Sequence, residues 1–257
     1  MTKKNVEVWR IDLTRPPHCL ATCWETLSAA EQAAANRFHH QADRLRFIVR
    51  RAARRDILGQ RLGLDPGQVV FAQGPFGQPA VSTAPTQSLN FSTSSTHNLA
   101  VVAVTSACLG TPSAPGEPNA IEDPSGPARQ VSNRSIGIDV EAHRGTAKDL
   151  AGVMQLLAPE EQSALERLLP DARIVAFYDC WTRKEALLKA LGLGLSAALD
   201  QFAVTLEPDR PASLLRLSLP ASSVHDWSLI PLELGDALSA TLAGPVGISV
   251  SYFDWPG

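Results

Sequence analysis

The sequence predicts an α/β (α+β) protein made of two similar α/β halves. Short apolar segments of strand length alternate along the chain with longer segments of helical period, the pattern of mixed helix and sheet. Two helix-like segments, residues 27–38 and 54–64, can be laid over residues 157–168 and 183–193 at offsets of 130 and 129 positions. A chain of 257 residues is long enough to bury a core in one large domain or two smaller ones.

The repeat has two explanations. Leu, Glu, Gln, Ala and Arg coincide in the first pair of segments, and both segments of the second pair end in Leu-Gly-Leu. Two ordinary amphipathic helix pairs would give some of this agreement. Duplication accounts better for the order and spacing, which hold across both helices. It predicts halves related by a pseudo-two-fold axis, and a cleft between such halves is a usual place for a ligand.

The first half, residues 1–106, is expected to begin with a strand and continue with two helices. Ser28 begins the first helix because Glu31 lies at the capping-box spacing. The second helix is rich in arginine and ends near Gly63, a residue that readily adopts the left-handed conformation after a helix. In chain order, the expected elements are the strand 6–13, a helix from Ser28, the helix 42–62 and the strands 69–71 and 99–105.

The second half, residues 136–257, is expected to repeat this order. A strand precedes two helices, and Gly192 and Gly194 end the second of them. In chain order, the expected elements are the strand 136–141, helices near 159–169 and 171–191, and strands near 201–206, 227–232 and 239–243, the last of these being the final strand.

Residues 107–135 differ in composition from both halves. Pro, Gly, Ser, Ala and Asn dominate there, and apolar residues are few. Such a composition cannot bury enough surface to offset the entropy of ordering the chain. We expect a disordered insertion between the halves, with a docking element for a partner as the alternative.

Composition argues against several classes of function. The net charge of −3 argues against a general nucleic-acid binder. The longest apolar run, residues 99–104, has the length of a strand and cannot cross a bilayer, and the first residues lack the apolar region of a secretory signal. The four cysteines form no CxxC pair and no zinc set with histidine, which favours reduced thiols in the cytoplasm.

Two carboxylates lie on one face of the strand predicted at 136–141. Side chains alternate across a strand, so Asp139 and Glu141 share one face. The apolar Ile136, Ile138 and Val140 share the other face, which can pack on a core. Like charges this close repel unless a cation lies between them, and Mg²⁺ suits one or two carboxylates with water and phosphate oxygens in its other positions. An edge strand with two solvated acids is the alternative, because Asp-x-Glu is common.

The helix predicted at 171–191 presents a third carboxylate and an ammonium group. Glu185 and Lys189 are four residues apart and so share a face, and Trp181 precedes Glu185 by four. Considered alone, this pattern is better explained as a surface ion pair worth about 0.2–0.5 kcal/mol. Three carboxylates and a lysine from a strand and a helix can instead hold a divalent metal against a phosphate ester.

The two motifs together are more specific than either alone. Gly-Ile-Asp-Val-Glu at 137–141, then Trp-Thr-x-Lys-Glu-Ala at 181–186 and Lys189, resembles the 4′-phosphopantetheinyl transferases, in particular the two-repeat, surfactin-synthetase-activating (Sfp-like) type. Further segments occur in the order that this family shows: Val6–Trp9, Arg37–Phe38, Gly77–Pro79 and Asn90–Ser94. The resemblance covers most of the chain except roughly 106–135.

This resemblance implies the family's fold of two α/β halves and its activity. That activity transfers the 4′-phosphopantetheine arm of coenzyme A to a serine of an apo acyl, aryl or peptidyl carrier protein and releases 3′,5′-ADP. By resemblance, Asp139, Glu141 and Glu185 would hold Mg²⁺. Glu185 and Lys189 would be catalytic, Glu185 by taking or orienting the serine proton and Lys189 by neutralising charge on the leaving side. The implied partners are coenzyme A and the carrier, without nucleic acid or membrane, for a monomer in the cytoplasm.

The nucleotide end is expected to involve Arg46, Ser92 and Thr93, together with Lys189. By resemblance, Arg46 lies at an arginine position used near the nucleotide, and the two hydroxyls belong to a turn that meets the phosphates of the coenzyme. A Ser/Thr-rich turn needs no function. The seven arginines between residues 44 and 61 are compatible with a solvated helix face, with phosphate binding or with an acidic carrier protein.

Three departures from the family pattern remove charge from the nucleotide end. The family commonly has a histidine where this chain has Thr93, and basic residues where it has Gln41 and Gln78. The predicted metal site keeps each expected group, so we expect the chemistry to be intact. How the chain binds the 3′-phosphate of coenzyme A is left undecided. A catalytically weak relative that binds a carrier protein or coenzyme A is therefore the alternative. A magnesium phosphotransferase that lacks coenzyme A is a second one, which the order of motifs disfavours.

Overall fold

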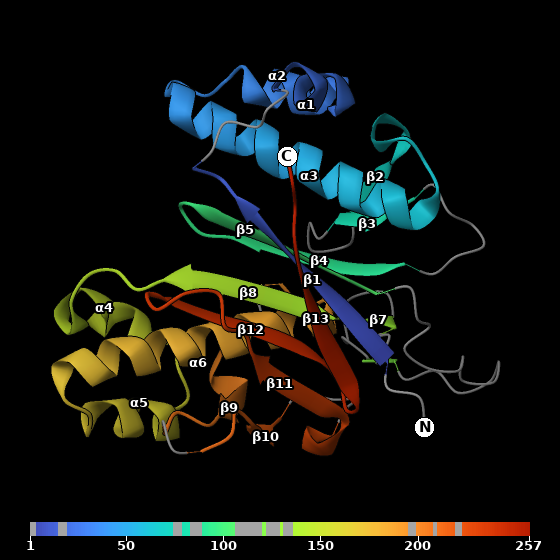
Figure 1. Ribbon diagram of the computed structural model, residues 1–257. Helices are drawn as coiled ribbons and strands as arrows, with labels where there is room; N and C mark the ends of the chain where they lie inside the picture. Colours follow the sequence, from blue (N-terminus) through green and yellow to red (C-terminus); the bar gives the residue numbers. More distant parts are fainter. Residues whose placement is uncertain are drawn as a thin grey trace. The chain divides into compact units, whose positions relative to one another are not determined.

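The computed structural model describes residues 4–14, 20–73, 79–82, 89–105, 120–121, 129–130, 136–194, 199–207, 210–218 and 223–257. Within these ranges the chain forms helices α1–α6 and strands β1–β13 (Figure 1). This mixed content confirms the predicted α/β class. The chain divides into two compact units: unit 1 comprises Met1–Lys4 and Cys108–Ser249, and unit 2 comprises Asn5–Ala107 and Val250–Gly257.

Unit 2 combines a four-stranded sheet, in the order β13-β1-β5-β4, with three helices (Figure 1). A separate pair of short strands, β2 and β3, is antiparallel. The strands are β1 (Lys4–Asp12), β2 (Phe71–Gln73), β3 (Pro79–Val81), β4 (Asn90–Ser95), β5 (Leu99–Thr105) and β13 (Ile248–Asp254). The helices are α1 (Leu20–Thr26), α2 (Ala29–Ala35) and α3 (Gln41–Leu62), followed by a 3-10 turn at Pro66–Gln68.

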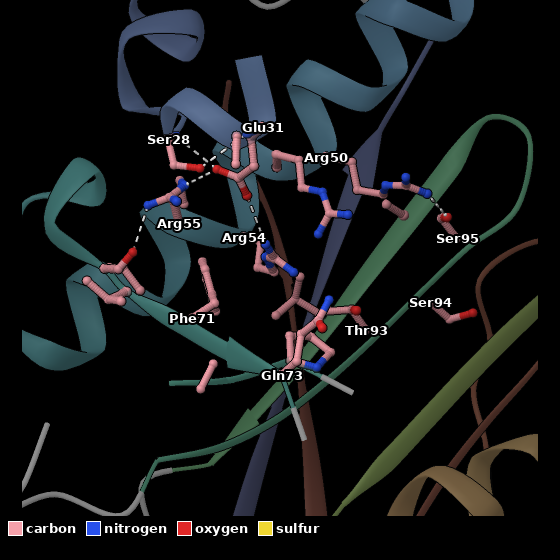
Figure 2. A pocket seen from close by; sticks show the side chains of 18 of the residues that line it. Ser28, Glu31, Arg50, Arg54, Arg55, Phe71, Gln73, Thr93, Ser94 and Ser95 are labelled. Carbon is pink, nitrogen blue, oxygen red and sulfur yellow. Dashed lines mark hydrogen bonds and ion pairs between the residues drawn. The ribbon is translucent and has the colours of Figure 1, made fainter. Parts of the chain in front are cut away.

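Helix α3 packs on the sheet and on the two shorter helices. Val49, Ala53 and Ile57, four residues apart, share a core cluster with β1 and β5. Ile48 and Ala52 share another cluster with α1 and α2. Arginines at other positions of α3 line, together with β2 and β4, a cavity of about 680 Å³ (Figure 2). We call it the arginine cavity; its lining arginines are Arg50, Arg51, Arg54 and Arg55.

The helix ends that the sequence predicted at Ser28, Gly63 and Gly192 are confirmed. The Ser28 side chain accepts a hydrogen bond from the Glu31 N–H, and the Glu31 carboxylate accepts one from the Ser28 N–H, which completes the predicted capping box. Gly63 follows α3 with φ of 66°, and Gly192 follows α6 (Pro170–Leu191) with φ of 70°. Both are in the left-handed region that favours glycine. Each unit therefore holds a long helix that ends in the same way.

Unit 1 contains a three-stranded antiparallel sheet in the order β11-β12-β8, with α6 packed against β8 and β12. Strands β9 and β10 form a second antiparallel pair. The strands are β8 (Gly137–Ala142), β9 (Phe202–Val204), β10 (Leu214–Leu217), β11 (Trp227–Pro231) and β12 (Leu238–Pro245). The remaining helices are α4 (Ala147–Met154) and α5 (Pro159–Glu166), and 3-10 turns lie at Leu199–Gln201 and Val224–Asp226.

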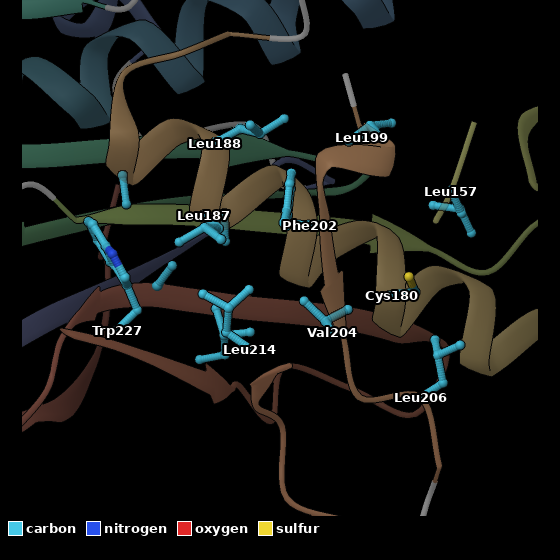
Figure 3. Packing of buried hydrophobic residues seen from close by; sticks show 14 of the residues in the cluster. Leu157, Cys180, Leu187, Leu188, Leu199, Phe202, Val204, Leu206, Leu214 and Trp227 are labelled. Carbon is cyan, nitrogen blue, oxygen red and sulfur yellow. The ribbon is translucent and has the colours of Figure 1, made fainter. Parts of the chain in front are cut away.

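The core of unit 1 forms around α6, as Figure 3 shows. Leu187, Leu188 and Cys180 of α6 are buried in one cluster with Phe202 of β9 and Trp227 of β11. This cluster holds one side of α6 in place.

The strand β4 corrects the expectation of a turn at Ser92 and Thr93. Both residues are part of β4, where they pair with Ala103 and Val102 of β5. The strand is at the edge of the sheet and is half-buried along its whole length. An edge strand needs no clear apolar alternation, and this polar sequence has none.

The last strand, β13, corrects the expectation that the final strand lies near 239–243. β13 is hydrogen-bonded to β1 in the sheet of unit 2, so Val250–Gly257 belong there and not to the predicted half 136–257. Side chains anchor it: Arg10 Nε lies 2.8 Å from Asp254 Oδ1, and Trp9 stacks on Phe253 with ring centroids 4.9 Å apart. Trp255 Nε1 donates to Asp56 Oδ2 at 2.8 Å.

Of the predicted insertion at 107–135, the structure describes only two short strands. β6 (Ala120–Ile121) pairs antiparallel with β7 (Arg129–Gln130). The rest of the segment lies outside the described residues, so its predicted disorder stays a prediction. The pseudo-two-fold axis between the halves likewise stays an expectation.

Gly137 allows α6 to approach β8 closely. A Cβ atom at this position would lie 2.0 Å from the Ala186 carbonyl oxygen and 2.6 Å from the Ala190 nitrogen. Because both atoms belong to the helix backbone, no side-chain rotation relieves the clash. We expect Gly137→Ala to lower the free energy of unfolding by at least about 1–3 kcal/mol, the usual cost of overpacking.

Chemical denaturation of the purified variant measures this change. Gly152→Ala on α4 is the matched control, since a Cβ there would meet nothing within 4 Å. A helical Gly→Ala change without a clash stabilises by about 0.5–1 kcal/mol. Equal stability of the two variants would contradict the close approach of α6 to β8.

Candidate active site

Strand β8 presents its two acids to α6, as the strand period predicts. Gly137 faces the α6 backbone, and Asp139 and Glu141 follow on the same face at alternate positions. Across the ladder, they are paired with Thr241 and Ser239 of β12. A polar layer therefore lies between the sheet and α6.

Helix α6 contributes Glu185 and Lys189 to this layer. Lys189 Nζ donates to Asp139 Oδ1 at 2.7 Å and to the Ile138 carbonyl oxygen at 2.9 Å. Glu185 is only 9% exposed, and its Oε1 is buried and makes no hydrogen bond within the described part of the chain. The structure thus pairs Lys189 with Asp139 and places Glu185 within electrostatic range of Asp139, Glu141 and Lys189.

Two carboxylates of this layer, Glu185 and Glu141, have raised pKa values. Burial, followed by the charges of Asp139 and Glu141, raises the pKa of Glu185 from 4.5 to about 7, although Lys189 acts in the opposite direction. Burial and Asp139 also raise the pKa of Glu141, against the opposing charges of Lys189 and Arg144. One lysine therefore does not offset three acids, and the site favours a further positive charge.

The carboxylates of this layer are suitable ligands for a hard cation, although they are not arranged around a common metal position. Among the described residues, no three acid, histidine or cysteine side chains already lie close enough together to hold a metal ion. Lys189 Nζ instead lies 2.7 Å from Asp139 Oδ1. The chemistry nevertheless fits Mg²⁺, which takes carboxylate oxygens, because the site holds mutually repelling carboxylates and a buried Glu185 Oε1 without a hydrogen bond.

The residues of unit 2 that were predicted to contact the nucleotide of coenzyme A lie in different places. Thr93 lines the arginine cavity together with Ser94 and Ser95 (Figure 2), and Ser92 is not among its lining residues. Arg46 lines a smaller cavity of about 210 Å³, where its Nη1 pairs with Asp43 at 3.0 Å and its Nη2 lies 2.9 Å from His97 Nε2. Gln41 is exposed at the start of α3, and Gln78 lies outside the described residues.

Comparison with known proteins supports the resemblance. A family model described as the 4′-phosphopantetheinyl transferase superfamily matches residues 135–242. The 4′-phosphopantetheinyl transferase HetI of Nostoc sp. is 34% identical over 252 residues, which cover 98% of this chain and 90% of the relative. A putative 4′-phosphopantetheinyl transferase of Synechocystis sp., slr0495, is 28% identical over 87% of this chain and 78% of the relative. The 4′-phosphopantetheinyl transferase Sfp of Bacillus subtilis is 23% identical over 73% and 70%.

The chain belongs to the 4′-phosphopantetheinyl transferase superfamily. It is an enzyme of the phosphopantetheinyl transferase class, and its fold class and Sfp-like type agree with the sequence prediction. The segment matched by the family model contains β8, α6 and the whole acidic layer of this transferase. None of its described helices is both long and apolar enough to span a membrane.

Lys184 of the transferase has a role that sequence reasoning missed. It is adjacent to Glu185, but one residue turns the helix by about 100°, so Lys184 points into the core. Its Nζ lies 2.8 Å from Glu161 Oε2 of α5 and donates to the carbonyl oxygens of Leu199 and Phe202. Lys184 is 0% and Glu161 1% exposed. The only available signal was the position of Lys184 on the apolar side of α6.

A second network that sequence reasoning missed extends the polar layer. Ser239 Oγ donates to Asp179 Oδ1, and His143 Nε2 lies 2.8 Å from the same Ser239 Oγ. The His143 ring stacks on Tyr178 of α6 with centroids 5.4 Å apart. His143 follows Glu141 by two positions, so the strand period places it on the same face as the two acids. The sequence therefore contained a signal for its place in this layer. These contacts hold the end of β8 against α6.

Glu31 of the transferase neutralises two arginines beside the arginine cavity. Its Oε1 lies 3.1 Å from Arg54 Nη2, and its Oε2 lies 2.7 Å from Arg55 Nε. Burial alone would raise the pKa of Glu31, but the hydrogen bond from Ser28 and the two arginines outweigh burial and lower it below 4.5. Folding therefore favours the charged carboxylate.

We expect Glu31→Gln to lower the free energy of unfolding by about 1–3 kcal/mol at neutral pH, because hydrogen bonds to charged groups are lost. A depressed folded-state pKa gives stability that is present above the unfolded value of 4.5 and is lost as pH falls through the lower, folded value. The gap in melting temperature between wild type and variant should therefore be constant above pH 4.5 and shrink below it. A gap that widens with acid would contradict this assignment.

Proposed function

We propose that this enzyme transfers the 4′-phosphopantetheine arm of coenzyme A to a serine hydroxyl of an apo acyl, aryl or peptidyl carrier protein. The serine oxygen forms a bond to the pantetheine-linked phosphorus of the pyrophosphate, the bond from that phosphorus to the bridging oxygen breaks, and 3′,5′-ADP leaves. The observation that carries the proposal is the pairing of Lys189 with Asp139 beside the buried Glu185, inside the segment that matches the family. The enzyme would act as a monomer in the cytoplasm.

Asp139, Glu141 and Glu185 would hold Mg²⁺. When bound there, Mg²⁺ would act as a Lewis acid on the pyrophosphate oxygens. The carboxylates that repel one another in its absence support this assignment. Phosphoryl transfer depends mainly on positioning and on stabilising spread charge, which suits a site of fixed carboxylates and one ammonium group.

Lys189 and Glu185 would be the catalytic side chains. Lys189 would donate to phosphate oxygens on the leaving side and so stabilise the charge that develops there. Glu185, whose pKa is raised to about 7, would accept or orient the proton of the serine hydroxyl. At the nucleotide end, Arg46, Ser92 and Thr93 would contact the coenzyme, with support from the two cavities that Arg46 and Thr93 line.

Incubation of the enzyme with coenzyme A, Mg²⁺ and a panel of apo carrier proteins tests the proposal. We expect intact-mass analysis to show one added phosphopantetheine on at least one carrier. A carrier whose acceptor serine is replaced by alanine, and a reaction with EDTA, should show no addition. If the enzyme binds coenzyme A or a carrier but no carrier in the panel gains mass, the result would favour the alternative of a catalytically weak relative that only binds them.

A further inference from the structure

The two acids of β8 each lie opposite a hydroxyl group in the sheet of unit 1. In the β8–β12 ladder, Asp139 is paired with Thr241, and Glu141 is paired with Ser239. Both hydroxyl residues are buried, with exposed fractions of 2% for Thr241 and 3% for Ser239. Residues directly opposite each other in an antiparallel pair have Cβ atoms about 4.5–5.5 Å apart. Whatever holds these hydroxyl groups therefore also bears on the position of the acids.

Helix α6 binds both hydroxyl groups. Thr241 Oγ1 lies 3.2 Å from Thr182 Oγ1, and Ser239 Oγ donates to Asp179 Oδ1. Thr182 and Asp179 precede Glu185 by three and six residues, within two turns of the same helix. Glu185 is the third carboxylate of the layer. The hydrogen bonds between β12 and α6 therefore join the helix that carries Glu185 to the sheet that carries the other two acids.

Ser239 has the more complete set of partners. Its single hydroxyl proton goes to Asp179, so its oxygen accepts the hydrogen bond from His143 Nε2, which is 2.8 Å away. The His143 ring stacks on Tyr178 of α6, and Arg183 Nη2 lies 3.6 Å from Asp179 Oδ2. A small apolar residue would fill the same buried position without these bonds. The orientation of Ser239 is thus fixed from β8, where His143 follows the strand, and from α6.

The acids of the layer need such a restraint because they repel one another when no cation is bound. Glu185 lies within electrostatic range of both Asp139 and Glu141. The repulsion acts between α6 and β8, the two elements whose spacing the bonds from β12 to α6 restrain. Residues outside a metal's ligand set that orient the ligands typically contribute a factor of about 10–100 to metal affinity.

We propose that Ser239 and Asp179 are positioning residues that, together with His143, fix the spacing between the acids of β8 and Glu185 for binding of Mg²⁺. The proposal rests on the proposed function, which assigns the three acids as ligands. Ser239 and Asp179 act through the backbones of β12 and α6 and not by contact with the metal. Without the Ser239 hydroxyl, the acids remain in the chain, but α6 and β8 are less firmly held at the spacing that the metal requires.

Binding of Mn²⁺ to the full chain, measured by electron paramagnetic resonance with and without coenzyme A, tests the proposal. Ser239→Ala should weaken Mn²⁺ binding about tenfold or more. In the transfer assay, it should raise the Mg²⁺ concentration for half-maximal rate by a similar factor and leave the KM for coenzyme A at saturating Mg²⁺ unchanged. Ser228→Ala is the matched control, since Ser228 lies on β11 of the same sheet, opposite Gly244.

Variants of Asp179 separate the hydrogen bond from the charge. Asp179→Ala should weaken Mn²⁺ binding as much as Ser239→Ala does. Asp179→Asn loses the charge, but its amide oxygen still accepts the Ser239 proton, so it should bind Mn²⁺ nearly as tightly as the wild type. The double variant of Ser239→Ala and Asp179→Ala should be no weaker than either single variant, because the two residues act as one unit. Additive losses would refute that coupling.

The remaining outcomes distinguish this proposal from the proposed function, with Asp139→Asn as the reference for a lost ligand. If Asp139→Asn loses Mn²⁺ binding but Ser239→Ala binds as tightly as the wild type, the positioning role is refuted and the proposed function stands. If Mn²⁺ binding depends on Ser239 but the wild type modifies no carrier protein, the positioning role stands and the transfer is refuted. A lower melting temperature of Ser239→Ala with unchanged Mn²⁺ affinity would mean that the hydroxyl only stabilises the fold.

Discussion

Replacing Lys184 with alanine is expected to lower the free energy of unfolding by about 3–5 kcal/mol, the cost of removing one partner of a buried ion pair. Glu161 would then be left as a charge that is 1% exposed. Its backbone hydrogen bonds from Ala158 and Val204, at 2.9 and 2.8 Å, cannot replace a cation. Denaturant unfolding of the purified variant measures the loss.

The matched control is Lys148→Ala, which removes an exposed lysine from α4 in the same unit. It should change stability by no more than about 0.5 kcal/mol. Combining Lys184→Met with Glu161→Gln should recover part of the loss, because no unpaired charge is then buried. A single Lys184→Ala variant as stable as the control would mean that the pair does not hold α5 to α6.

Asp139→Asn is expected to reduce transfer of phosphopantetheine by about two orders of magnitude, since a metal-held phosphate gains several kcal/mol of transition-state stabilisation. Asparagine keeps the size of the side chain but loses the charge that pairs with Lys189 and that would bind Mg²⁺. Excess Mg²⁺ should restore only part of the rate. Steady-state assays at several Mg²⁺ concentrations, with intact-mass detection of the carrier, provide the measurement.

Asp236→Asn is a suitable control because Asp236 is exposed in the turn before β12. It should retain the wild-type rate and Mg²⁺ dependence. The melting temperature of Asp139→Asn should also be recorded, since a folded but inactive variant separates chemistry from stability. Wild-type activity of this variant at limiting Mg²⁺ would refute the role of Asp139 as a ligand.

The acidic layer could be predicted because it depends only on local periods. The alternation of β8 puts Asp139 and Glu141 on one face, and the helical period puts Glu185 and Lys189 on one face, without knowledge of the fold. The partners of Lys184 could not be predicted, because they come from α5, β9 and a 3-10 turn that only the folded unit brings together. Periodicity reports what each element contributes, but it does not identify what packs against it.

The edges of the sheets were the least predictable part of the fold. β4 is half-buried throughout, so its polar sequence has no alternation from which a strand could be recognised. β13 pairs with β1, near the opposite end of the chain. Such a pairing depends on long-range contacts that no local pattern specifies.

The pairing of β13 with β1 has a consequence for synthesis on the ribosome. β1 (Lys4–Asp12) is synthesised long before β13 (Ile248–Asp254). The sheet of unit 2 therefore lacks one strand until β13 has been synthesised, and one edge of β1 stays open during that time. A nascent chain that stalls before residue 248 would expose this edge to other chains, so premature termination should lead to aggregation of the N-terminal unit.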